Sequence, residues 1–368
     1  MENMEEISRE ENPVQIVSEE TSKRIISLRY LLSVLVVCIH ANLTPELANY
    51  YHYEFIQPYW IEVCKNFICN ILGGAAVPLF FFFASFLQFK KNDTYGELLR
   101  KRSKSLLLPY IVWTIITVLL FFISQSIPQT ASYFQNPMNI VKNWKGLDWI
   151  KIFTFCSDTY PFVGQFWFLR ELIIFIILSP ILKFLCERVP GIIIIFISVA
   201  ALKEVPLFFT VSSSAFFFYV AGYFCAVKKI AFFRLSDKIR FYEYILLLVL
   251  VVVFDITSGG KYRFGFITTI ISCLFFLKLS GYLIKKEKVY KKLEYLSGLS
   301  FFLYAVHAPF ISGTINKITQ RVIPLHGILC LFQFLLASFL TIIIGTLIGI
   351  LCRKICPRLF NILNGGRK

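Results

Sequence analysis

The sequence predicts an all-α polytopic membrane protein with about ten transmembrane helices and both termini in the cytoplasm. Of the 368 residues, 57% are hydrophobic and only 16% are charged, whereas soluble domains carry about 25% charged residues. Ten segments approach or exceed the roughly 20 apolar residues that cross a bilayer. This composition excludes an ordinary soluble enzyme and a disordered chain.

The ten predicted spans follow one another along most of the chain. They cover residues 25–43, 67–89, 106–126, 166–186, 190–207, 213–228, 243–257, 263–282, 296–317 and 325–352. No strand-like alternation accompanies them, which argues against a transmembrane barrel. Residues 1–21 are polar and acidic, lack the pattern of a signal peptide and are expected to form a cytoplasmic tail. Residues 22–352 are then one ten-helix domain, and 353–368 form a basic cytoplasmic tail.

The positive charges support this topology. When the 38 Lys and Arg residues are sorted by predicted side, 27 fall on one side and nine on the other, and Arg29 and Arg170 lie inside spans. The positive-inside rule places the richer side in the cytoplasm. Topology therefore accounts for most of the net charge of +16, and no nucleic-acid partner is expected.

The first span carries two ionisable residues on one face. Arg29 and His40 are 11 residues apart, which brings them within about 20° on a helix and separates them by about 16 Å along its axis. Ser33 lies on the same stripe. Ionisable groups inside a membrane are costly and are functional candidates, so the stripe suggests a path between the two sides. The alternatives are that Arg29 snorkels to the interface and that His40 lies in the headgroup zone.

Two further spans carry titratable residues. Arg170 and Glu171 are neighbours in the fourth span, and Glu171 could orient His40 as a carboxylate does in a catalytic triad. A structural ion pair near the outer boundary is the alternative for Glu171. His307 lies in a late span three residues after Tyr304, and the alternative for it is a hydrogen-bonded packing histidine.

The long outer loop, residues 127–165, combines aromatic and acidic side chains that suit contact with carbohydrate: Trp144, Asp148, Trp149, Asp158 and Tyr160. An interfacial aromatic belt would explain its tryptophans equally well. The four histidines do not have metal-ligand spacing, and no nucleotide-binding glycine motif is present, so no metal site is expected.

Five segments in order resemble acyltransferase family 3, the bacterial integral-membrane O-acyltransferases that modify surface polysaccharides. They read SLRYLLSVLVVCIHA, VPLFFFFASFL, RKRSKSLLLPYIVW, FWFLRELI and LSGLSFFLYAVHAPF. The resemblance covers residues 22–352. Two departures from the family pattern are Ala84-Ser85 in place of Ser-Gly, and Ser105 in place of the second arginine of Arg-x-x-Arg.

The resemblance implies transfer of an acyl group, usually acetyl from cytosolic acetyl-CoA, to a hydroxyl of an exported polysaccharide or lipid-linked glycan at a bacterial plasma membrane. It implies His40 as a catalytic residue, either as general base for the sugar hydroxyl or as acceptor of the acyl group. Glu171, which lies one position before the family's carboxylate, is the second predicted catalytic residue. The implied donor-binding residues are Arg29, Lys101, Arg102 and Lys104, and those lining a channel or acceptor site are Ser33, Trp167, Arg170, Tyr304 and His307. For the basic cluster, positive-inside topology alone is an alternative explanation.

Two other classes of protein remain open. A polysaccharide or lipid-linked-sugar transporter would also have many spans and buried charges, but it should show repeats between its halves. A membrane protein without chemistry would tolerate the loss of His40. Acyl incorporation from labelled acetyl-CoA, compared between the wild type and His40→Ala, separates these readings.

Overall fold

A computed structural model describes residues 17–43, 54–91, 93–131, 140–152, 161–203, 205–207, 211–257 and 265–367. Helices dominate these residues, and the β-type pairing among them is a single bridge between Ile56 and His326. The structure therefore confirms the predicted all-α class.

The chain up to residue 177 begins with the central helix α1 and ends with a short buried helix. Its helices are α1 (Glu19–Ala41), α3 (Tyr59–Asn66), η1 (Phe67–Leu72), η2 (Gly73–Ala75), α4 (Ala76–Phe89), α5 (Tyr95–Arg102), η3 (Ser103–Leu107), α6 (Leu108–Ser126), α7 (Pro128–Ala131), η6 (Val141–Asn143), α8 (Asp148–Lys151), η7 (Gly164–Phe166) and α9 (Trp167–Ile177). Local signals fix several of these ends. Ser18 caps α1 by accepting from the Thr21 amide at 3.2 Å, and Thr94 and Glu97 form a capping box at the start of α5.

The remainder of the chain is also helical. Its helices are α10 (Ser179–Arg188), α11 (Pro190–Leu202), α12 (Ser213–Val227), α13 (Phe232–Lys238), α14 (Phe241–Thr257), α15 (Gly265–Lys285), α16 (Glu287–Ser297), α17 (Ser300–Val306), η9 (His307–Ile311), α18 (Ser312–Val322), α19 (Leu329–Ile355) and α20 (Pro357–Leu363).

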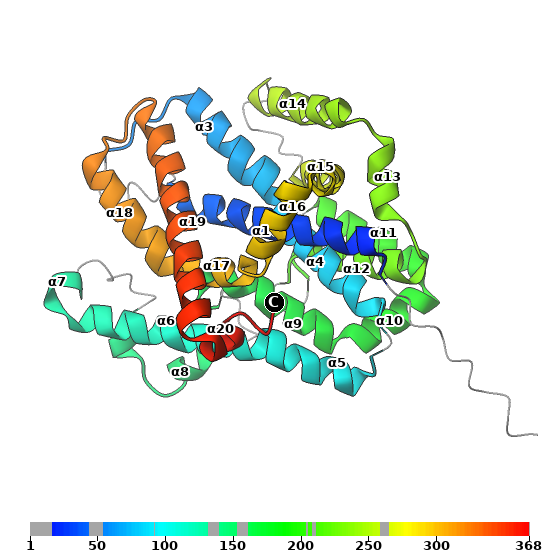
Figure 1. Ribbon diagram of the computed structural model, residues 1–368, viewed down its shortest axis with the longest axis horizontal. Coiled ribbons are helices and arrows are strands. Elements are labelled where there is room, and N and C mark those ends of the chain that lie inside the picture. The colour runs from blue at the N-terminus through cyan, green and yellow to red at the C-terminus, as the bar shows by residue number, and fades with distance from the viewer. Residues whose placement is uncertain are drawn as a thin grey trace, which may run out of the picture.

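Helix α1 runs through the middle of the molecule (Figure 1). It packs against α15, α16, α17, α19 and α4, which come from both halves of the chain. Leu28 and Leu32 on α1 are fully buried in this contact. Because helices surround it, α1 is a suitable element to hold a polar stripe away from lipid.

Five helices of the described residues are long and apolar enough to cross a membrane, and the number rises to eight if each of three bent helix pairs counts as one span. Every predicted span overlaps a helix, so the polytopic architecture stands. The count of ten and the cytoplasmic placement of the termini stay predictions.

The difference in count comes from bends. The predicted span 166–186 is divided at Leu178, whose ψ of 0° ends α9 after 11 residues, a length of about 16 Å. Helices α10 and α11 meet at a bend of 114°, directly before Pro190, which favours the first turn of a new helix. Short helices joined at bends fill the membrane domain where straight spans were expected.

Side-chain contacts bring together loops that the sequence places on the same side. On the predicted inner side, Arg24 donates to both carboxylate oxygens of Asp237 at 2.6 and 2.9 Å, and to Ser280 Oγ at 2.9 Å. On the predicted outer side, Lys65 donates to the Leu43 carbonyl at 3.0 Å and to Gln57 at 2.9 Å. The packing is therefore consistent with the predicted alternation of sides.

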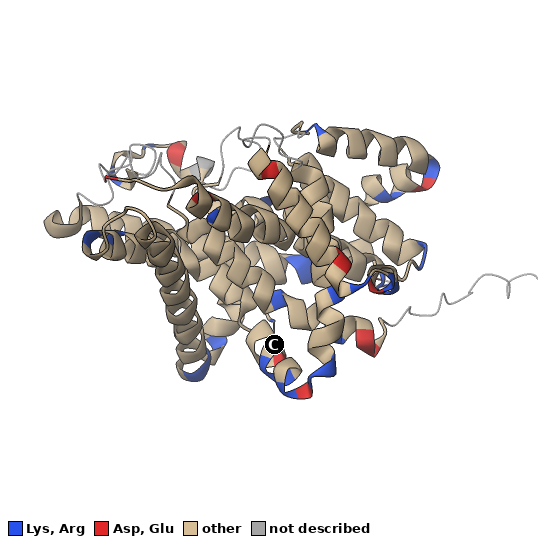
Figure 2. Ribbon diagram, turned by 90° about the horizontal axis from the view of Figure 1, so that it is seen from above, with Lys and Arg blue, Asp and Glu red and all other residues tan. Residues whose placement is uncertain are grey.

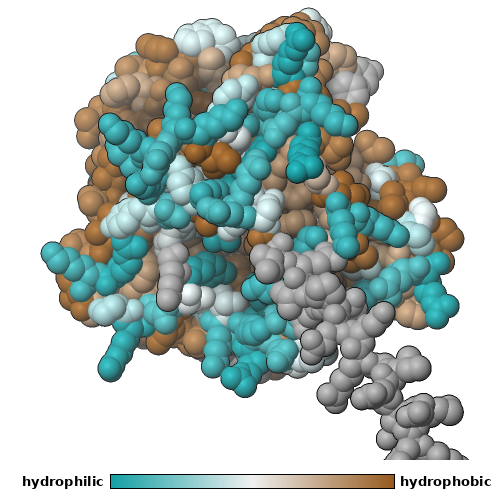
Figure 3. Space-filling view, turned by 45° about the vertical axis from the view of Figure 1, so that its right-hand side comes forward, coloured by the Kyte–Doolittle hydropathy of each residue, from teal (hydrophilic) through white to brown (hydrophobic). Residues whose placement is uncertain are grey.

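Charge and hydropathy follow the same division. In Figure 2 most Lys, Arg, Asp and Glu residues lie at helix ends and in connections, while the helix segments between them are mostly tan, the colour of the other residues. Figure 3 brings forward the side on which α13 and the beginning of α1 lie, and hydrophilic side chains gather over that face with hydrophobic ones at its margins. Large apolar side chains are exposed along α6, α11, α14 and α19, as expected for surfaces in contact with lipid.

The C-terminal residues 353–367 are folded against the helices. Helix α19 continues to Ile355, and α20 packs on α6. Trp113 Nε1 of α6 donates to the Leu363 carbonyl at 2.9 Å. The segment predicted as a basic tail is thus ordered at the predicted inner side, where Trp113 lies near the start of α6.

Candidate functional site

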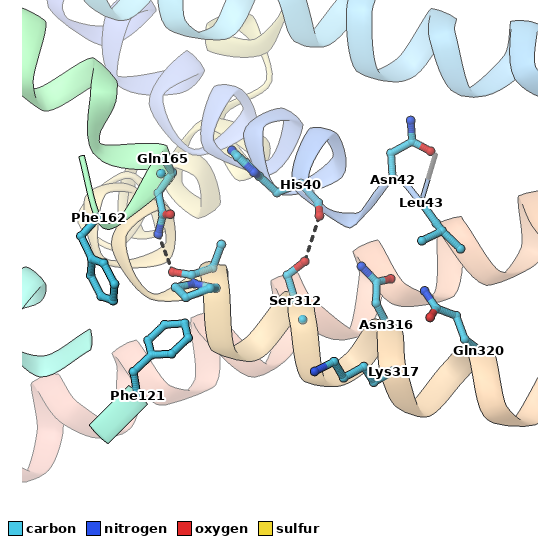
Figure 4. A pocket seen from close by; sticks show the side chains of 14 residues that line it. His40, Asn42, Leu43, Phe121, Phe162, Gln165, Ser312, Asn316, Lys317 and Gln320 are labelled. Atoms are coloured by element: carbon cyan, nitrogen blue, oxygen red, sulfur yellow. Dashed lines mark hydrogen bonds between the residues drawn. The ribbon is translucent and has the colours of Figure 1, made fainter. Parts of the chain in front are cut away.

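A cavity of about 370 Å³ opens beside the outer end of α1. Figure 4 shows His40 at one edge of it and the polar side chains of α18 along another. Its lining comes from α1, α6, the segment before α9, η9 and α18, and comprises His40, Asn42, Leu43, Phe121, Phe162, Gly164, Gln165, Ala308, Pro309, Ser312, Gly313, Asn316, Lys317 and Gln320. The cavity therefore joins the end of the first predicted span to the last segment of the family resemblance, which contributes Ala308 and Pro309, and to residues that directly precede the fourth segment.

Two histidines meet at this cavity. The rings of His40 and His307 lie 5.1 Å apart between their centroids. His40 is exposed, whereas His307 is completely buried. His40 thus opens to the cavity, and His307 lies behind it.

The hydrogen bonds of His307 define its tautomer. Its Nδ1 lies 2.7 Å from the Tyr304 carbonyl, which can only accept, so Nδ1 carries the proton. In the neutral ring Nε2 is then an acceptor, and it is buried without a hydrogen-bond partner. A buried acceptor that lacks a donor is costly, which marks this nitrogen as a functional group.

Gln165 ties the segment before α9 to the segment that carries His307. Its side-chain amide donates to the carbonyl oxygens of Ala305, at 3.4 Å, and Ala308. Tyr304 donates its hydroxyl to the Gln165 carbonyl at 2.5 Å. Tyr304 is therefore a structural link beside His307, and Gln165 is a cavity residue that sequence reasoning missed.

Helix α18 presents polar side chains at intervals of four residues: Ser312, Asn316 and Gln320. Figure 4 shows them along one edge of the helix, toward Asn42 and Leu43. Ser312 donates to the His40 carbonyl at 3.1 Å, and Gln333 holds Asn316 at 3.1 Å. The Gln320 Oε1 and Asn42 Oδ1 atoms are buried without partners. These oxygens can accept hydrogen bonds from the hydroxyls of a ligand.

Aromatic rings border the other edge of the cavity. Phe121 and Phe162 line it, 5.4 Å apart between their centroids. Phe162 in turn lies 5.0 Å from Trp144, which packs edge-on against Trp149 at 5.3 Å. Apolar faces beside hydrogen-bonding groups suit a sugar ring. Asp158 and Tyr160 of the same predicted loop lie outside the described residues.

Glu171 is not beside His40. One of its carboxylate oxygens accepts from the Ser212 amide at 3.1 Å, and the other is buried without a partner. Among the described residues no hydrogen bond or ion pair joins Glu171 to His40. Arg170 is likewise buried, at 2% exposure. The neighbour that the structure gives His40 is His307, whereas Glu171 lies against the turn before α12.

Two other predicted lining residues make local contacts. Ser33 donates to the carbonyl of Arg29 on its own helix, at 3.2 Å. Trp167 is half-buried and lies 6.4 Å from Phe81 between ring centroids. Neither residue is among those that line the outer cavity.

The predicted donor-binding residues lie toward the inner side and differ in their environments. Arg29 and Arg102 are half-buried, whereas Lys101 and Lys104 are exposed. Lys101 pairs with Asp93 at 2.5 Å. Within the described residues neither Arg29 nor Arg102 has a carboxylate within ion-pair distance. These two guanidiniums are therefore the better candidates for binding an anion.

A helical membrane domain with a histidine pair at a polar cavity on the predicted outer side, and arginines on the predicted inner side, fits an integral-membrane enzyme of group transfer. The chain matches the acyltransferase domain family, Acyl_transf_3, over residues 23–352. It therefore belongs to this family of acyltransferases.

One relative is the succinoglycan biosynthesis protein ExoH of Rhizobium meliloti. The two sequences are 22% identical over 361 residues, which cover 94% of this chain and 92% of the relative. No solved structure matches the chain.

Proposed function

We propose that this protein is an O-acyltransferase that moves an acyl group, acetyl in the first instance, from cytosolic acyl-CoA to a hydroxyl of a cell-surface or exported polysaccharide at a bacterial plasma membrane. The observation that carries the proposal is the exposed His40 beside the partnerless Nε2 of His307 in a cavity of about 370 Å³. Family membership and the role that the relative's name gives it, biosynthesis of the polysaccharide succinoglycan, support this class of reaction and acceptor.

The cavity suits a sugar as acceptor. Asn42 and Gln320 line it with amide side chains whose oxygens are buried and lack partners in this structure, and the rings of Phe121 and Phe162 cover apolar faces. A turn of either amide into the cavity would let its oxygen accept from a sugar hydroxyl and recover the free energy of a lost hydrogen bond. These groups therefore support a polyhydroxylated ligand over an apolar one of equal size.

The proposed chemistry needs one base and one donor. His40 accepts the proton of the sugar hydroxyl while the hydroxyl oxygen attacks the thioester carbonyl. The C–S bond then breaks, the thiolate takes the proton from His40, and the products are the sugar ester and free coenzyme A. His307 positions His40 through their ring contact. When the His40 ring turns toward the partnerless Nε2 of His307, that nitrogen accepts one N–H of the ring, and the other ring nitrogen of His40 serves as the base.

The test is acyl transfer in membranes that contain the full chain. Wild type, His40→Ala and His326→Ala are supplied with labelled acetyl-CoA or succinyl-CoA, and label in the polysaccharide fraction is counted. His326 is an exposed histidine near the outer cluster of Leu43 and Leu325 and does not line the cavity, so it is the matched control. We expect transfer in the wild type and His326→Ala and loss in His40→Ala. Transfer that persists in folded His40→Ala would refute the mechanism. Labelling by succinyl-CoA but not by acetyl-CoA would show that the transferred group is succinyl.

The transporter alternative gains no support from the bends. Inverted-repeat transporters carry broken helices at corresponding places in their halves. In the described parts of the chain, all three sharply bent pairs lie after residue 178. Export of an unmodified glycan by reconstituted protein would nevertheless replace the proposal by this alternative.

A further inference from the structure

The last residues of the described chain fold back into the protein. We call Asn364–Arg367 the C-terminal hook. It lies outside residues 23–352, which match the family. Asn364 is fully buried and donates to the Gly298 carbonyl at 2.8 Å and to the Arg367 carbonyl at 2.7 Å. Arg367 returns a bond from Nη1 to the Asn364 carbonyl at 2.9 Å. The hook is thus fixed both to the turn before α17 and to itself.

Glycine allows the hook to approach η3 closely. Gly365 and Gly366 have φ values of +64° and +70°, a region that glycine adopts without strain. A Cβ atom on Gly365 would overlap the carbonyl oxygen of Ser105. Ser105 is three residues after Arg102, so the contact holds the hook within one helical turn of that arginine.

The hook places a third arginine near Arg29 and Arg102. The Arg367 guanidinium lies 4.1 Å above the ring of Phe301 on α17, and α17 packs against α1, which carries Arg29. Burial, and then the positive charges of Arg29 and Arg102, lower the pKa of Arg367 to about 9. That value is still above neutral pH, so the Arg367 guanidinium stays charged and adds to the positive charge of Arg29 and Arg102.

Like charges at close range are unfavourable unless an anion compensates them. Among the described residues no carboxylate lies within ion-pair distance of Arg29, Arg102 or Arg367, and the carboxylate of Asp93 pairs with Lys101. Arginine forks bind phosphate in a bidentate manner. These three guanidiniums therefore supply the positive charge and the hydrogen-bond donors that suit phosphate groups.

We propose that Arg367, delivered by the C-terminal hook, completes with Arg29 and Arg102 the site that binds the phosphate groups of the acyl-CoA donor. This inference rests on the proposed function, because it takes acyl-CoA as the donor. It adds a specificity residue from outside the family region, and it explains why residues 364–367 are folded inward at the inner side. Phosphate groups of anionic lipids share this chemistry and are the competing source.

The experiment measures binding of coenzyme A to the purified full-length protein in a neutral detergent. The variants are Arg367→Ala, Gly365→Ala and, as matched control, Arg358→Ala, which removes an exposed arginine from α20. Loss of a charged hydrogen-bonded pair weakens binding about tenfold or more. We expect that increase in Kd for Arg367→Ala and Gly365→Ala, and no change for Arg358→Ala.

The outcomes separate the two proposals. Equal Kd values in the wild type and Arg367→Ala would refute the role of the C-terminal hook in donor binding and leave the proposed function intact. If the wild type does not bind coenzyme A at all, the proposal that acyl-CoA is the donor is wrong. If Arg367→Ala instead reduces co-purified phosphatidylglycerol or cardiolipin while its Kd for coenzyme A is unchanged, the site belongs to lipid and the inference is wrong.

A folding defect would not obscure the result. Thermal unfolding compares all variants first, and Arg367→Lys replaces Arg367→Ala if the latter unfolds early. Lysine keeps the charge but loses the planar fork, so a loss of a few-fold in coenzyme A affinity supports the inference. Wild-type affinity in both Arg367→Lys and Arg367→Gln contradicts it.

Discussion

The ring of His40 lies 5.1 Å from the ring of His307, although the two residues come from opposite ends of the chain. The contact is held by the backbone, because Ser312 of α18 donates to the His40 carbonyl at 3.1 Å. His307 is buried and its Nδ1 is committed to the Tyr304 carbonyl. Nε2 is therefore the ring nitrogen of His307 that can interact with another side chain, and the histidine ring next to it is that of His40.

Replacement of His307 tests this relationship. We expect His307→Ala to lower kcat for acyl transfer by about 10²-fold, because a misplaced catalytic group can cost that much, while KM for the acyl-CoA donor is unchanged. Radiolabel transfer at several donor concentrations gives both constants. A KM effect without a kcat effect would mean that His307 lines the donor path instead. Wild-type kinetics would show that it only fills space.

His40 itself is expected to be rescued from outside. General acid–base catalysis contributes about 10²–10⁴-fold, so His40→Ala should lose that factor. Because His40 is exposed beside a cavity of about 370 Å³, added imidazole has room to enter and should restore part of the rate. The rate is measured against imidazole concentration, with His307→Ala as the comparison, whose buried position should prevent rescue. Equal rescue of both variants would contradict the assigned roles.

Much of the fold follows from the sequence because membrane helices are specified locally. Apolar length and loop charge are properties of one segment at a time, and each predicted span overlaps a helix. The bends are different. The end of α9 at Leu178 and the fold-back of α20 onto Trp113 depend on partners far away in the chain. The burial of Arg24 could not be predicted from the sequence either. Its position before the first predicted span indicates a charge in a loop, but the side chain is buried at 1% exposure.

The site was predictable only in part for a related reason. Arg29 and His40 stand out because they are polar residues in an apolar helix. Ser312, Asn316 and Gln320 repeat every four residues, which is a usable signal, but the predicted span ended at residue 317 and divided the stripe. The neighbours of His40 and Glu171 could not be chosen from sequence, because His307 and Ser212 come from other elements, far away in the chain, and only the packing brings them there.

The link between Gln165 and Tyr304 should be measurable as stability. Tyr304→Phe removes the donor to the Gln165 carbonyl but keeps the ring packing. Leaving a buried acceptor unsatisfied costs about 1–3 kcal/mol, so the thermal unfolding midpoint in detergent should fall. Activity should fall further than stability explains, because the link also positions the His307 segment. Tyr295→Phe, at an exposed tyrosine on α16, is the control and should behave as wild type.

The buried arginine of the inner side gives a second stability prediction. Arg24 has side-chain partners on α13 and α15, Asp237 and Ser280, and breaking a buried pair costs about 3–5 kcal/mol. Because Asp237 is 39% exposed, we expect Arg24→Ala to lie near the low end of that range. Lys23→Ala is the control, since its pair with Glu19 is exposed and within one helix turn, a class of pair that contributes little to stability. Similar losses in the two variants would show that Arg24 is not the clamp between these helices.

Adding a single methyl group where α4 and α12 pack tightly together should lower the stability of the protein. Helices α4 and α12 pack along Gly222, where an added Cβ would overlap the Phe82 carbonyl and lie 3.0 Å from Ser85 Cβ. Backbone atoms cannot turn away as a side chain does, so Gly222→Ala must push the helices apart. Overpacking costs about 1–3 kcal/mol, which outweighs the gain of up to about 1 kcal/mol in helix propensity.

Gly96 provides the matched control because it is also helical but has no atom within 4 Å of an added Cβ. We therefore expect Gly96→Ala to unfold at or slightly above the wild-type temperature, and Gly222→Ala to unfold clearly below it. Thermal unfolding of both variants in one detergent makes the comparison. Equal stability of Gly96→Ala and Gly222→Ala would mean that α4 and α12 are farther apart at Ser85 than the structure places them.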